Sequence, residues 1–171
     1  MKKTVRLYNL IFPIWLLWLL PMTWIVVLPV NLLIDFTVVY LTCRVRKHQD
    51  AGALTRKVIW KVWLMGFLAD FIGTALMFLS NVIDFGAGTP AGQWWNQHIP
   101  AAICYNPFEN IFAFLWVTAC VAVTGVLLYV FNYHVCLKKA LPDQAERKKI
   151  ALSVAVFTAP YLFYLPTSWF Y

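Results

Sequence analysis

The sequence predicts an all-α membrane protein, a polytopic bundle of helices that crosses a bilayer several times. Apolar residues make up 62% of the 171 residues and charged residues only 12%, whereas soluble domains average about half and about a quarter. A soluble fold of this size could not bury so much apolar surface. The Lys and Arg residues gather in short clusters beside long apolar runs, which is typical of membrane helices with cytoplasmic anchors.

The first apolar stretch, residues 7–43, is too long for one ordinary span of about 20 residues and short for two. Three prolines interrupt it: Pro13, Pro21 and Pro29. Each removes a backbone donor and crowds the preceding turn, so each is a candidate break. We expect a short re-entrant or kinked segment at about 8–20 and a full span at about 22–42. One long, tilted, kinked helix is the alternative.

Basic residues flank this stretch on both sides. Three precede it and five follow it before the next span: Lys2, Lys3, Arg6, Arg44, Arg46, Lys47, Arg56 and Lys57. Positive flanks stay in the cytoplasm, so both ends should lie inside. That requires an even number of crossings or a hairpin that turns near Pro21, with protein around the bend to satisfy its backbone.

The second predicted span covers about 58–83, with Trp60 and Trp63 at its basic end, as an interfacial aromatic belt predicts. The following segment, 84–106, contains no Lys or Arg. We therefore place it outside. Its Gly and Pro content argues against a regular element there.

The third predicted span, about 107–137, opens with a start signal. Asn106 suits the N-cap, Pro107 the first helical position, and Glu109 completes a capping-box pattern. The span then runs inward to a second basic turn, which places its end in the cytoplasm.

A second capping pattern, Asp143 and Glu146, precedes the last predicted span at about 149–168. Pro160 and Pro166 are expected to kink or end this span. It finishes outside. All 14 Lys and Arg residues then lie on one side of the membrane.

These segments predict a single membrane domain over residues 1–171, with four main transmembrane helices. The N-terminus lies in the cytoplasm and the C-terminus outside. The short chain, its MKK start and its plain charge bias favour a bacterial source, and hence the plasma membrane.

Two acids lie at membrane depth. Asp35 is nine residues before Arg44, and Asp70 is nine residues after Lys61. At 1.5 Å per residue, each is about 13 Å from the cytoplasmic edge. Asn31 is one helical turn before Asp35, on the same face. An ionised acid at that depth is unfavourable without a partner.

Two interpretations of these acids stay open. In the first, Asp35, Asp70 and Asn31 form a proton or cation site. In the second, each acid is protonated and hydrogen-bonds a neighbouring helix, so that it contributes only to helix packing. Small residues support close packing of the second and third spans: Gly66, Ala69, Gly73, Ala119, Ala122 and Gly125.

The sequence offers little for an enzyme. His98, Cys104 and Glu109 share the outer segment, but their spacing matches no metal site and no nucleophile with a positioned base. We expect no cofactor and no metal. The net charge of +7 comes without a nucleic-acid recognition motif, so nucleic acid is not an expected partner.

The first functional hypothesis is a non-enzymatic membrane module or accessory subunit of a larger membrane complex. The alternative is a small oligomeric transporter or channel, coupled to protons or cations through Asp35 and Asp70. A membrane-embedded enzyme that uses the outer segment is the least favoured.

Overall fold

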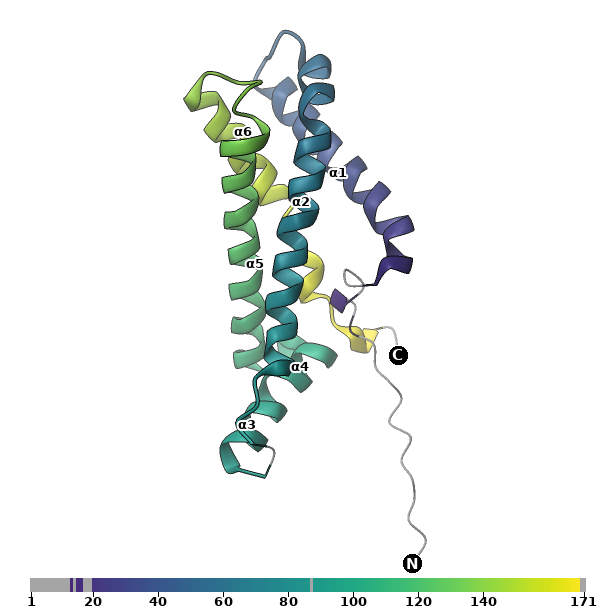
Figure 1. The fold of residues 1–171 in the computed structure, drawn as a ribbon, viewed down its shortest axis with the longest axis vertical. Coiled ribbons are helices and arrows are strands. Elements are labelled where there is room, and N and C mark those ends of the chain that lie inside the picture. Colours follow the sequence, from purple (N-terminus) through teal and green to yellow (C-terminus); the bar gives the residue numbers. More distant parts are fainter. Residues whose placement is uncertain (1–12, 14, 17–19, 87, 170–171) are drawn as a thin grey trace, which may run out of the picture.

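The computed structural model describes residues 13, 15–16, 20–86 and 88–169, and these form helices and connecting turns with no strand (Figure 1). Among them, three helices are long and apolar enough to cross a membrane: Pro21–Val45, Ala51–Val82 and Ile111–Cys136. The predicted helical class is confirmed, and these three helices are compatible with the predicted membrane location, whereas four such helices were predicted. Most of the predicted short segment at 8–20 lies outside the described residues.

Helix α1 (Trp24–Val45) follows a short 3-10 turn, η2 (Pro21–Thr23), and contains Pro29 in its interior. Figure 1 shows α1 diverging from α2 (Ala51–Val82) toward its own N-terminal end. The Nε1–H of Trp63 donates a 3.0 Å hydrogen bond to the carbonyl of Leu28. This bond ties α2 to α1 beside the proline, where the helix lacks one backbone donor.

Helices α2 and α5 (Ile111–Phe131) form the centre of the bundle (Figure 1). A Cβ on Gly73 would overlap the Oγ1 atom of Thr124 and lie 3.0 Å from Cε2 of Phe163. Glycine therefore permits the close approach of these helices. The predicted contact surface on α5 is wrong in part, because Ala119 and Ala122 are exposed.

The segment predicted to lack regular structure forms two short helices, α3 (Pro90–His98) and α4 (Pro100–Tyr105). The prediction failed because both prolines occupy first helical positions, where the missing N–H removes no helical hydrogen bond. The hydroxyl of Thr89 caps α3 by accepting a 3.0 Å bond from Gly92 N.

The predicted start of the third span is displaced. Asn106 accepts a bond from Phe108 N and donates one to Glu109 Oε1, as expected of a cap. These residues form only one 3-10 turn, η3 (Pro107–Glu109). Helix α5 begins after a second cap, Asn110, and ends in a π-helical turn, η4 (Asn132–Cys136).

The last predicted span, 149–168, is not one continuous helix. Helix α6 (Gln144–Phe157), capped by Asp143, ends partway along the predicted span. Two 3-10 turns follow, η5 (Tyr161–Tyr164) and η6 (Thr167–Trp169). Pro160 and Pro166 explain the break, because neither has an N–H and each disfavours a helical conformation of the residue before it.

The basic residues within the described ranges gather at one end of the bundle, here called the basic end (Figure 1). They are Arg44, Arg46, Lys47, Arg56, Lys57, Lys61, Lys138, Lys139, Arg147, Lys148 and Lys149. Arg46 Nε donates a 3.0 Å bond to Glu146 Oε2, which joins the end of α1 to the start of α6. From there the chain descends through η5 to η6, which contacts α4 at the opposite end.

Candidate proton or cation site

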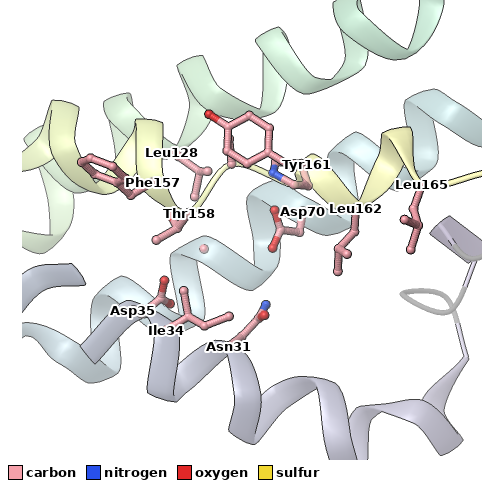
Figure 2. Close-up of a pocket in the computed structure, with 13 residues that line it drawn as sticks. Asn31, Ile34, Asp35, Asp70, Leu128, Phe157, Thr158, Tyr161, Leu162 and Leu165 are labelled. Atoms are coloured by element: carbon pink, nitrogen blue, oxygen red, sulfur yellow. The ribbon is translucent and has the colours of Figure 1, made fainter. Parts of the chain in front are cut away.

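A cavity of about 310 Å³ lies where α1, α2 and the stretch between α6 and η5 meet (Figure 2). Its polar lining residues include Asn31, Asp35, Asp70, Thr158 and Tyr161. The rest of the wall is mainly apolar. The three residues predicted for a proton or cation site therefore share one cavity.

Asp35 belongs to α1 and is only 6% exposed. Asn31 lies one turn earlier on the same face and lines the same space. Gly66 of α2 lines the same cavity, and a Cβ there would lie 3.4 Å from Asp35 Oδ2, an ordinary van der Waals distance. The carboxylate of Asp35 therefore lies against the surface of α2 at Gly66.

Asp70 belongs to α2, one helical turn beyond Gly66, and is 5% exposed. Figure 2 shows its carboxylate directed into the space that Asp35 enters from the facing helix. Among the described residues, no hydrogen-bond partner reaches the buried Oδ1 atom of Asp70. A buried carboxyl oxygen without a partner is rare and unfavourable, and it points to a ligand.

The third wall is a break in the last segment. The N–H of Tyr161 donates a 2.7 Å bond to Ala159 O, a tight turn that helix geometry does not make. The hydroxyl of Tyr161 folds back and donates a 2.7 Å bond to Val156 O. The turn at Thr158 and the side chain of Leu162 border the space that the acids enter, whereas the ring of Tyr161 points back toward α6 (Figure 2).

The cavity has negative character. Within the part of the chain that the structure describes, no Lys, Arg or His lines it. Two carboxylates cannot both remain ionised in an apolar environment unless a positive species lies between them. The arrangement can hold a proton on one of the two carboxyl groups, or another cation in the space that both acids enter.

The outer-segment residues considered for catalysis have other partners. His98 Nδ1 lies 2.8 Å from Trp94 O, and its ring stacks on that tryptophan. Cys104 Sγ lies 3.9 Å from Asn81 Oδ1. Glu109 pairs with the cap residue of η3. Within the described residues, no group of three or more His, Cys, Asp or Glu side chains could hold a metal.

Comparison with protein-family models, with curated proteins and with solved structures finds no match to this chain.

Two contributors to the cavity were not predicted as site residues, Gly66 and the turn at 158–162. The signals were present in the sequence. Gly66 lies one turn before Asp70 on the same helical face, and Pro160 marks a break at membrane depth. What the sequence did not show is that this break lies beside the acids.

Proposed function

We propose that this chain is a small membrane transport protein whose Asp35–Asp70 cavity binds a proton or another cation. The observation that carries the proposal is the unpartnered, buried Oδ1 of Asp70, directed into a cavity that a second buried acid enters from another helix. Intramembrane acids that face an internal cavity usually belong to an ion or proton pathway.

The chain break supports the same function. Membrane carriers place substrate and ion sites where helices are discontinuous, because unwound backbone supplies polar groups and lets the two halves move separately. Here the break follows α6 and directly faces both acids. Movement of η5 relative to α6 would change the wall of the cavity and would also shift Phe163, which packs against α2 and α5.

The site also lies at a depth suited to exchange between the two sides. Asp35 and Asp70 are both about 13 Å from the basic edge, near the middle of a ~30 Å hydrocarbon core. A cation that enters would displace the shared proton, and a proton that returns would release the cation. Such competition for one pair of carboxylates couples the two fluxes.

For the topology, we propose that the basic end faces the cytoplasm of a bacterial cell and that the C-terminus lies outside. The clustering of the described basic residues at one end supports this orientation. Residues 144–169 extend from that end to the neighbourhood of α4. They would form a fourth, broken crossing, shielded by α1 and α5. The assembly would be an oligomer, which short transporters often need to enclose a pathway.

The test is cation-driven proton flux in proteoliposomes that contain the wild type, Asp35→Asn or Asp70→Asn. Either amide keeps the shape of the side chain but removes the charge, so we expect flux to fall by about tenfold or more. Asp143→Asn is the matched control, because asparagine also serves as an N-cap and the residue lies outside the cavity.

Thermal unfolding of each variant separates transport from folding. The proposal requires that both amide variants unfold within a few degrees of the wild type while flux is lost. Wild-type flux in both variants would refute it.

The accessory-module hypothesis is the second candidate. It is favoured by an exposed groove of about 190 Å³ between α2 and α5. Its lining residues are Leu76, Leu79, Trp116, Ala119, Cys120 and Val123. An accessory module would need this groove to bind its partner and would not need the acids. Val123→Trp would therefore cause loss of a partner helix during isolation in mild detergent, whereas Asp70→Asn would not.

A further inference from the structure

The acid cavity is larger than a bare ion requires. Its volume of about 310 Å³ compares with about 30 Å³ for one water molecule in the liquid. Apart from the acids, Asn31 and the turn, the walls are aliphatic and aromatic: Ile34, Leu128, Phe157, Leu162 and Leu165. A small inorganic cation would leave most of this apolar wall without contacts.

A second hollow continues from the first along the side of the bundle. This α1–α6 groove, of about 340 Å³, is lined by Val38, Leu41, Thr42, Val45, Arg46, Ser153 and Phe157. Phe157 lines both spaces. On α1, Asp35, Val38 and Thr42 follow one another at helical spacing, so one face of the helix connects the acid to the groove.

The groove opens toward the lipid rather than toward the bundle interior. Leu41 is 50% exposed, Val45 78% and Phe157 68%. Its far end is bordered by Arg46, whose charge is paired with Glu146. The acids therefore lie at one end of the apolar groove, and a compensated ion pair lies at the other.

We propose that the ligand of this site is an amphiphilic organic ammonium ion that enters sideways from the bilayer. Its cationic head lies between Asp35 and Asp70, and its apolar chain lies in the α1–α6 groove. Charge complementarity sets the direction, because the two carboxyl groups lie at one end and the Arg46–Glu146 pair at the other end leaves no carboxylate free for a cationic head. This inference rests on the proposed function, for which it names the class of substrate.

Two further features fit this ligand. Phe157 and Tyr161 are among the residues that line the acid cavity as a whole, and aromatic faces attract organic ammonium groups. From Asp35 to Val45 the groove is about 15 Å long at 1.5 Å per residue. An extended alkyl chain of about 12 carbons has this length, at about 1.25 Å per bond along its axis.

The test is equilibrium binding of radiolabelled dodecyltrimethylammonium to the protein in lipid nanodiscs, with empty nanodiscs as background. Tetramethylammonium tests the head alone, and the uncharged dodecyl maltoside tests the chain alone. We expect the amphiphile to bind the wild type about tenfold or more tightly than tetramethylammonium, and Asp70→Asn to lose at least about tenfold in affinity. Asp35→Asn repeats the test should the Asp70 variant fold poorly.

A bulky residue in the groove isolates the contribution of the chain. Ser153→Trp should weaken binding of dodecyltrimethylammonium about tenfold and leave tetramethylammonium unchanged. Leu152→Trp is the matched control, because this neighbour on α6 lies outside both hollows and is 53% exposed.

Four results would overturn the inference. Equal affinity for tetramethylammonium would show a site for the head alone, and competition by dodecyl maltoside would show a groove for lipid chains. If no ammonium ion binds while proton or sodium flux still depends on both acids, the proposed substrate class is wrong and the proposed function is unaffected. Flux that is independent of both acids would remove the proposed function as well.

Discussion

At the scale of single residues, glycine sets the distance between the two central helices. Gly73 faces Thr124 and Phe163 so closely that any side chain would collide with them. We predict that Gly73→Ala lowers the free energy of unfolding by about 1–3 kcal/mol, the usual effect of overpacking. Thermal unfolding in detergent measures this change.

Gly125 on α5 provides the matched control. A Cβ there would meet no atom within 4 Å. In the interior of a helix, alanine is favoured over glycine by about 1 kcal/mol. Gly125→Ala should therefore leave the melting temperature unchanged or raise it. Equal destabilisation by both substitutions would contradict the packing explanation for Gly73.

The candidate site could be predicted in part at this scale. Depth follows from the rise per residue counted from a charged edge, so the sequence alone placed Asp35 and Asp70 at one level. Asn31 followed from the helical repeat. The role of Gly66 could not be predicted, because it depends on how closely α1 and α2 approach each other, which only the packed structure determines.

At the scale of elements, the contact between the ends of α1 and α6 depends on pH. The hydrogen bond from Arg46 and its positive charge lower the pKa of Glu146 from 4.5 to about 2, although desolvation opposes this shift. Because the folded pKa is lower than the unfolded one, the contribution to stability is complete above about pH 4.5. It is lost as the pH falls toward 2.

We therefore predict that the difference in melting temperature between wild type and Glu146→Gln is constant above about pH 5 and disappears near pH 2. A difference that grows as the pH falls would contradict the assignment of the pair.

A second element-scale prediction concerns α1 beside Pro29. The bond from Trp63 Nε1 to Leu28 O holds this part of α1 against α2. Trp63→Phe keeps an aromatic ring but removes the donor, so amide hydrogen exchange in residues 25–32 should become faster. Trp60→Phe is the control, since Trp60 is 64% exposed on the neighbouring face. Equal exchange in both variants would show that the bond does not restrain α1.

The helices were predicted correctly where the length of an apolar run determines the element. The prediction failed where a proline can either end a helix or begin one. The helices within 22–42 and 58–83 followed from apolar runs and their basic flanks. The Gly and Pro content of segment 84–106 argues against a regular element, but Pro90 and Pro100 begin helices there. Pro160 was correctly expected to interrupt a span. The direction of the chain after it depends on Phe163, which is buried against α2 and α5.

At the scale of the whole molecule, the proposed orientation predicts which surfaces each compartment can reach. Gln49→Cys lies at the basic end and Gln93→Cys on α3, and both positions are exposed. In intact cells, a membrane-impermeant thiol reagent should label Gln93→Cys and spare Gln49→Cys until the cells are opened. The wild type, with its four native cysteines, sets the background. Labelling of Gln49→Cys in intact cells would reverse the topology.

The central claim is that Asp35 and Asp70 hold one positive species between them, either a proton or a cation. Infrared difference spectroscopy of the protein in lipid, recorded as cation is added, tests this claim directly, because a protonated carboxyl group has its own C=O stretching band. We predict that the band decreases as cation binds and carboxylate bands increase. Asp35→Asn and Asp70→Asn should each abolish this change. A difference spectrum identical in wild type and both variants would contradict the account.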